Sequence, residues 1–155
     1  MKLAEALLLR ADLQKRFSSL RERVIQNTVV QEGETPSEDP KGLLAEVAKT
    51  AAKLEELISA VNTANCEMTT SSGRSIAAAL VERDVLILRH GVVQAAASSV
   101  VKPPERYGNK EIRWVKTVDP AVLQKEADEL AQSIRRVNAE IQSSNWAVDI
   151  NANEE

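Results

Sequence analysis

The chain has little of what most catalytic and metal sites are built from. Its 155 residues include one histidine, His90, and one cysteine, Cys66. A zinc site of the usual ligand set and a di-iron centre in a helical bundle both need more of these residues. The five glycines stand alone, so no Gly-rich phosphate loop is present. We therefore expect no enzyme, no catalytic residues, no metal and no cofactor.

The chain also lacks an excess of one charge and long apolar runs. The net charge is −3 and acids and bases are interspersed, so no face suits a phosphate backbone and we expect no nucleic-acid partner. The uncharged run of residues 90–101 is about half as long as a membrane-spanning helix needs. A single cysteine cannot form an internal disulfide, which agrees with a reducing compartment. These features predict a cytoplasmic protein.

What the chain does have is the apolar periodicity of long helices. The pattern predicts helices over about 2–27, 40–65, 75–99 and 119–146, with Asp-Pro start signals at 39–40 and 119–120. Residues 28–32 and 111–118 are rich in β-branched residues and predict a pair of strands. We expect a mainly α fold: an elongated, coiled-coil-like bundle of four long helices with a small two-stranded antiparallel β ribbon. The bundle would form a single domain over 1–150, with a disordered tail at 151–155.

The second and fourth predicted helices resemble each other. An offset of 80 residues superimposes Asp39 on Asp119 and Pro40 on Pro120, and several later positions coincide as well. Either a duplication or two Asp-Pro-capped amphipathic helices of equal length would explain this agreement.

The third predicted helix carries charges in apolar surroundings. Residues 79–96 read ALVERDVLILRHGVVQAA, and on a helical wheel the most apolar arc contains Asp84 at its centre. Because we expect that arc to face the core, Asp84 needs a buried partner. Arg10 is the other charge on a predicted buried seam. The sequence therefore predicts a buried ion pair between Arg10 and Asp84.

The opposite arc of the same helix mixes charged and apolar residues. Such a mixture is tolerated at a subunit contact, where apolar anchors lie inside a charged rim. We therefore predict a homo-oligomer interface formed by Glu82, Arg83, Leu86, Arg89, His90 and Val93.

Several segments resemble the septicolysin-like family of small bacterial helical proteins of unknown function. They include MKLAEALLLRADLQKR, VQEGETPSEDP, LVERDVLILR, EIRWVKTVD and VLQKEADELAQSIRRVNAEIQSSNW. The resemblance implies a helical fold that assembles with itself, as a hexamer or a dimer. The function expected is non-enzymatic, structural or interaction-based; the alternative, implied by the family name, is a membrane-active, lysin-like pore-forming protein.

Overall fold

The computed structural model describes residues 1–101 and 115–151, and its described part is mainly helical. The prediction of a mainly α fold with four long helices is confirmed, and each helix begins and ends within two residues of its predicted position. The helices are α1 (Leu3–Asn27), α2 (Pro40–Glu67), α3 (Ile76–Val101) and α4 (Pro120–Ala147). Of the predicted tail, only Asn151 falls within the described residues.

Side chains cap the starts of three helices, at Asp39 and Asp119 as the sequence predicts and also at Ser75. Asp39 accepts hydrogen bonds from the backbone N–H groups of Lys41 and Gly42 at 3.2 and 2.9 Å. Asp119 accepts one from Ala121 at 2.9 Å, and Ser75 caps α3 by accepting one from the third helical residue at 3.1 Å. These bonds satisfy N–H groups that have no partner within the helix.

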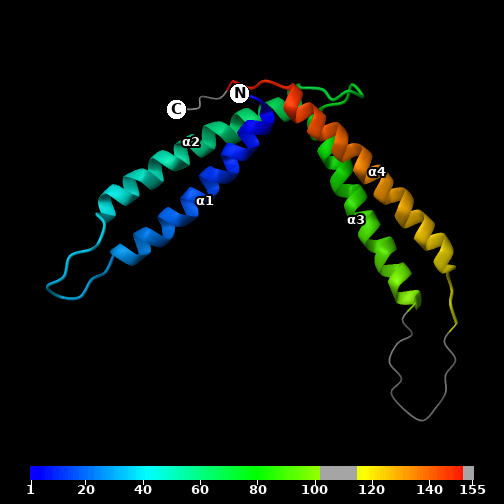
Figure 1. Ribbon diagram of the computed structural model, residues 1–155, viewed down its shortest axis with the longest axis horizontal. Coiled ribbons are helices and arrows are strands. Elements are labelled where there is room, and N and C mark those ends of the chain that lie inside the picture. Colours follow the sequence, from blue (N-terminus) through cyan, green and yellow to red (C-terminus); the bar gives the residue numbers. More distant parts are fainter. Residues whose placement is uncertain (102–114, 152–155) are drawn as a thin grey trace, which may run out of the picture.

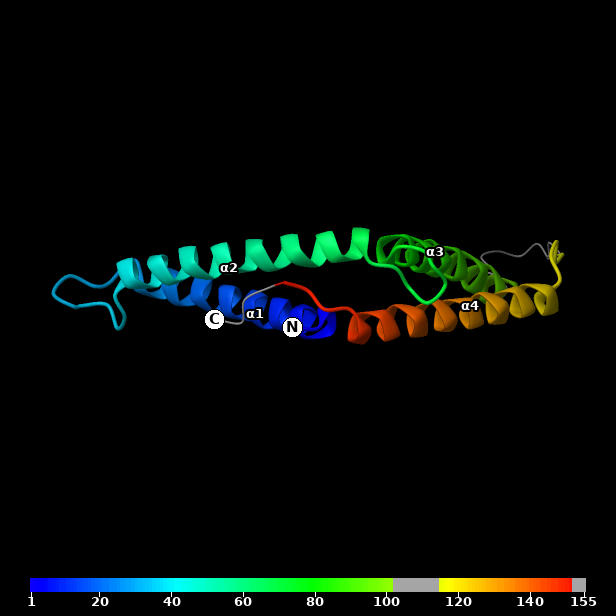
Figure 2. The same ribbon diagram turned by 90° about the horizontal axis from the view of Figure 1, so that it is seen from above.

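The four helices form two antiparallel hairpins that meet at an angle (Figure 1). One arm consists of α1 and α2 and the other of α3 and α4, and the N-terminus lies near the apex where the arms join. The helices therefore do not run side by side as one bundle over their whole length. Seen from above, α2 and α3 follow each other along one side, and α4 and α1 along the other (Figure 2).

Two equivalent sets of backbone hydrogen bonds join the arms at the apex. The N–H of Leu3 donates to Val148 O at 2.9 Å, and the N–H of Ile76 donates to Met68 O at 3.1 Å. The first bond joins the start of α1 to the residue after α4. The second joins the start of α3 to the residue after α2. Isolated antiparallel bridges lie beside both bonds, Lys2 with Asp149 and Thr69 with Ser75.

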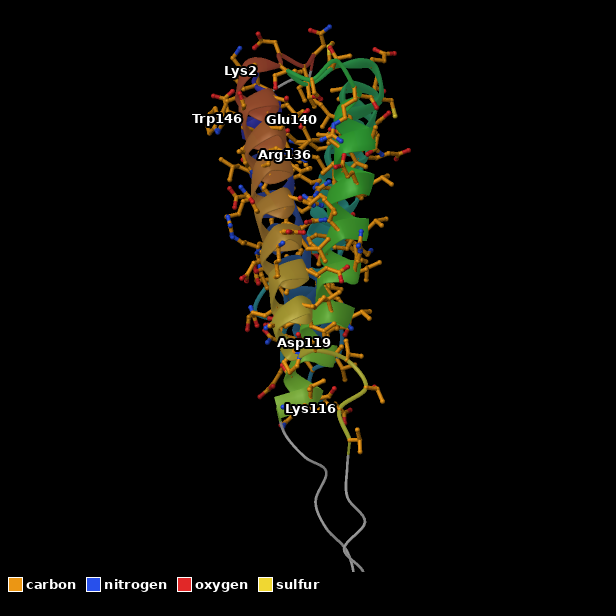
Figure 3. All side chains as sticks on the ribbon, turned by 90° about the vertical axis from the view of Figure 1, so that its right-hand side faces the viewer. Lys2, Lys116, Asp119, Arg136, Glu140 and Trp146 are labelled. Atoms are coloured by element: carbon orange, nitrogen blue, oxygen red, sulfur yellow. The ribbon has the colours of Figure 1, made fainter. Side chains whose placement is uncertain are left out.

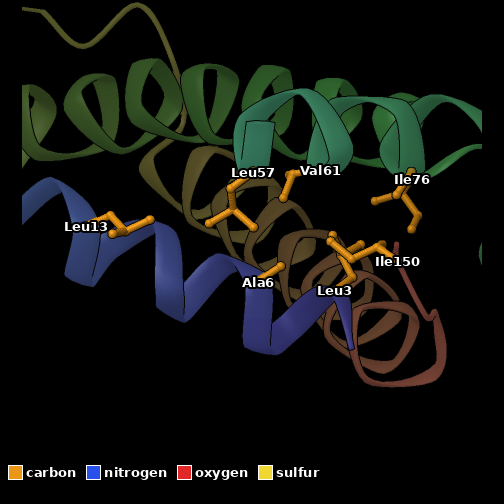
Figure 4. Packing of buried hydrophobic residues seen from close by; sticks show 8 residues of the cluster. Leu3, Ala6, Leu13, Leu57, Val61, Ile76 and Ile150 are labelled. Atoms are coloured by element: carbon orange, nitrogen blue, oxygen red, sulfur yellow. The ribbon is translucent and has the colours of Figure 1, made fainter. Parts of the chain in front are cut away.

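The largest apolar cluster lies at the same apex (Figure 4). Leu3 and Ile76 are fully buried there, in contact with a cluster that includes Val61 and Ile150. The cluster therefore contains residues from α1, α2, α3 and the segment after α4. Its burial removes apolar surface from water and stabilises the junction of the arms.

The two arms are structural repeats. An offset of 73 residues relates α1 to α3, and an offset of 80 relates α2 to α4. Under these offsets the ion pair of Arg16 with Glu46 at 3.5 Å corresponds to that of Arg89 with Glu126 at 2.7 Å. The patterns of buried and exposed residues agree along both helix pairs. The agreement between the second and fourth helices thus extends to whole hairpins, which favours a repeated unit over a coincidence of two helices.

The predicted β ribbon is wrong for the residues that the structure describes. Neither 28–32 nor 115–118 forms a strand, while 111–114 lies outside the described residues. The reason is the hairpin arrangement, in which 28–32 lies at the tip of one arm and 115–118 near the tip of the other (Figure 1). The two segments are too far apart to pair.

Replacing Ile76 by alanine tests the importance of the apex. We expect Ile76→Ala to lower the free energy of unfolding by about 2–5 kcal/mol, because it leaves a cavity where both arms meet. Leu3→Ala, at the position of α1 equivalent to Ile76, should lower the free energy of unfolding by a similar amount. Urea denaturation at one fixed protein concentration measures both. Val122→Ala, at an exposed position on α4, is the control and should change the value by less than about 0.5 kcal/mol. If Ile76→Ala lowered the free energy of unfolding as little as the control does, the apolar contact at the apex would not be important for stability.

Candidate functional site

One side of α3 packs along α4. Figure 3 shows these two helices side by side along their arm. Near the apex Ala79 packs with Val137 and Ile141 of α4, and Leu86 lies against this group. Further along, Val93 packs with a second group of α4 residues that includes Ala127 and Leu130. The inner face of α3 is therefore built on residues seven apart: 79, 86 and 93.

This inner face contains the residues predicted to form a subunit interface. Leu86 is half-buried and Val93 is buried against α4, so these two apolar anchors are used within the chain. Arg83 and His90 are half-buried, and Arg89 lies at the edge, where its Nη2 donates to Glu126 Oε1 of α4 at 2.7 Å. The predicted interface is therefore wrong for Leu86 and Val93. Apolar packing of this arc on α4, with the ion pair of Arg89 and Glu126 at its edge, turns it inward.

A polar network ties the start of α3 to α4. Arg74, in the turn before α3, forms an ion pair with Glu82. Its Nη2 also donates to Glu140 Oε2 at 2.8 Å, and Ser72 donates to the same carboxylate. Hydrogen bonds from Arg74, then from Ser72 and Thr70, lower the pKa of Glu140 to about 2 because they favour its charged form. The network binds the connecting turn to both helices of one arm.

The predicted buried ion pair does not form. Asp84 is exposed and accepts hydrogen bonds from Arg83 at 2.9 and 2.7 Å. Arg10 is half-buried on α1, and its buried Nε has no hydrogen-bond partner among the described residues. The prediction failed because it placed the arc around Asp84 in the core, whereas that arc faces solvent.

The solvent-facing arc of α3 carries an apolar stripe. We call this the outer stripe; it consists of Val81, Val85, Leu88 and Val92, which are 64, 57, 72 and 71% exposed. Steps of four and three residues place these side chains in one row on the side away from α4. Sequence reasoning assigned the stripe to the core because it is the most apolar arc of the helix. A seven-residue step does not separate the two faces, because 81 and 88 are also seven apart. The signal that could have identified the inner face is the repeat, since the offset of 73 aligns 79, 86 and 93 with Ala6, Leu13 and Leu20 of α1.

The equivalent face of α1 is mostly polar. The offset of 73 places Leu8, Asp12, Lys15 and Ser19 at the positions of the four stripe residues. All four are exposed, and Lys15 lies 3.5 Å from Asp12 as an ion pair. One repeat thus has a mostly solvated outer face where the other has an apolar one. Because both arms fold in the same way, packing within an arm does not require the outer stripe.

Other surfaces offer less for binding or chemistry. A groove of about 740 Å³ runs between α2 and the segment after α4, with Glu55, Glu67 and Asp149 among its lining residues. Within 1–101 and 115–151, no three His, Cys, Asp or Glu residues gather closely enough to hold a metal ion. In those same ranges no helix is long and apolar enough to cross a membrane.

The polar network makes stability depend on pH. The ordinary pKa of Glu140 is 4.5 and the folded value is about 2, so its contribution is present above pH 4.5 and is lost as the pH falls toward 2. We expect Glu140→Gln to flatten the pH dependence of unfolding in that window. At pH 7 it should cost on the order of 1–3 kcal/mol. Urea denaturation at several pH values measures both effects.

Glu129→Gln is the matched control on the same helix, since Glu129 is exposed and 3.9 Å from Lys125. If Glu140→Gln left the pH dependence of unfolding unchanged, or if both substitutions changed it equally, Glu140 would not be the group responsible for that dependence.

Comparisons with known proteins agree with this fold and name no activity. The model of the family described as "Family of unknown function (DUF6847)" matches residues 10–150. A crystal structure from Corynebacterium diphtheriae, described as that of a functionally unknown conserved protein, has a TM-score of 0.89 and 32% sequence identity. The alignment covers 97% of this chain and 99% of that chain. No curated protein matches, and the resemblance to septicolysin-like proteins stays a prediction. The match over 10–150 shows that the chain belongs to the DUF6847 family of unknown function.

Proposed function

We propose that this protein is a non-enzymatic helical protein that assembles with itself and has a structural or interaction role. The observation that carries the proposal is the outer stripe of α3, four large apolar side chains that are all more than half exposed. A contiguous exposed apolar surface of this kind is typical of an interaction site. Other exposed apolar side chains, such as Leu44 and Val122, are scattered over the arms and need no partner.

A membrane-active role has weaker support from the same surface. Helices that lie on lipid usually present lysine and arginine along their polar face. The outer stripe is flanked instead by Glu82 and Asp84 together with Arg89. The mixed charge at its edges suits a protein partner better than an anionic lipid surface. The cytoplasmic location stays a prediction.

Sedimentation velocity tests the proposal directly. One chain has a mass of 17.0 kDa, and we expect a larger particle at micromolar concentration because water would otherwise contact the outer stripe. A single 17 kDa species up to tens of micromolar would refute self-assembly. Release of dye from liposomes by the same sample would instead favour the membrane-active role.

A further inference from the structure

We infer that the outer stripe of α3 binds the outer stripe of α3 in a second copy of this chain, around a two-fold axis. The inference rests on the proposed function and names the surface that performs it. Three features of the described residues support it: the spacing of the stripe, the charges beside it and its absence from the other arm.

The spacing suits a partner that is itself a helix. Val81, Val85, Leu88 and Val92 follow steps of four, three and four residues, the repeat by which two helices pack along a seam. No charged residue interrupts the row, which extends about 17 Å at the helical rise per residue. Gly91 lies beside the row, and a Cβ placed there would meet open space, so a partner helix can approach closely on that edge.

The charges at the edges of the stripe complement a second copy. Arg89 and Glu82 lie along one edge and Asp84 along the other. In a parallel pair, Arg89 of one copy lies near Asp84 of the other, five residues apart in sequence. In an antiparallel pair, Arg89 lies near Glu82 of the other copy. Arg89 binds Glu126 within its own chain, and either direction brings a further acid to it and places no like charges together, which favours self-association.

The other arm provides an internal comparison. At the positions of Val85, Leu88 and Val92, α1 has Asp12, Lys15 and Ser19. Both helices pack against their hairpin partners with the same pattern of burial, so the stability of a hairpin does not explain the apolar residues of α3. A contact made by one arm only does explain them.

Self-association through one stripe also limits the size of the assembly. When the same surface is used on both copies, the contact is closed by a two-fold axis and stops at two chains. Of the two assemblies that the family resemblance implies, a hexamer and a dimer, the dimer needs this surface alone. A hexamer would need a further contact.

The substitution Val92→Glu tests the inference, with Ser19→Glu as the matched control. The two positions are equivalent in the repeat, both are exposed, and each substitution adds one negative charge. We expect Val92→Glu to weaken the dimer on the order of a hundredfold or more, because the contact would bury two unpaired carboxylates. Ser19→Glu should leave dimerisation unchanged. Sedimentation velocity over a range of concentrations measures both dissociation constants, and far-UV circular dichroism verifies that the helices are retained.

Crosslinking provides a second readout that does not depend on how well Val92→Glu folds. In a Cys66→Ser background, Leu88→Cys places a thiol near the middle of the stripe, so a short bismaleimide should join two copies in either direction of pairing. Lys15→Cys, the equivalent position on α1, should give little crosslinked dimer. Equal crosslinking at both positions would contradict the inference.

Each outcome separates this inference from the proposed function. Dissociation by Val92→Glu alone, together with crosslinking at position 88, supports the pairing of α3 with α3. If the Val92→Glu variant still assembles, the outer stripe is not the contact surface, and the proposal that the chain assembles with itself is retained. A monomeric unmodified chain refutes both. A monomer that co-sediments with anionic phospholipid vesicles, and loses this binding in Val92→Glu, shows that lipid and not a second copy covers the stripe.

Discussion

The arrangement of the molecule depends on the contact between the two hairpins at the apex. Leu3 and Ile76 are fully buried side chains at the first residues of α1 and α3, and their N–H groups donate to Val148 and Met68. These bonds fix where two helices begin, and the apolar cluster holds the hairpins at their angle. Without this contact each hairpin would have only its own two helices to bury apolar surface, and two helices alone provide a small core.

The repeat lets one arm take on a role that the other lacks. Within each arm the residues that hold the hairpin together are similar, as the equivalent ion pairs of Arg16 and Arg89 show. The outer faces differ, because no contact within the chain constrains them. The polar face around Lys15 stays hydrated, while the apolar face around Leu88 gains from leaving water. The difference between two equivalent helices therefore points to function more clearly than either helix alone.

The sequence predicted local structure well and the arrangement of helices in space poorly. Asp39 and Asp119 marked helix starts correctly because capping depends on neighbouring residues only. The orientation of α3 was predicted wrongly because its most apolar arc is not the arc that packs within the chain. The packed arc is set by its partners on α4, such as Val137, Leu130 and Glu126, which are distant in sequence. The same error led to the wrong partner for Asp84 and to the interface prediction at Leu86 and Val93.

The angle between the arms affects how an assembled particle would move in solution. Two chains that meet along α3 would use one arm of each, and α3 lies on the side of its arm that faces the other arm (Figure 1). Such a particle has a high frictional coefficient for its mass and tumbles more slowly than a sphere of equal volume. Within each chain the loop of residues 28–39 lies at the tip of the arm formed by α1 and α2, far from the apex (Figure 1).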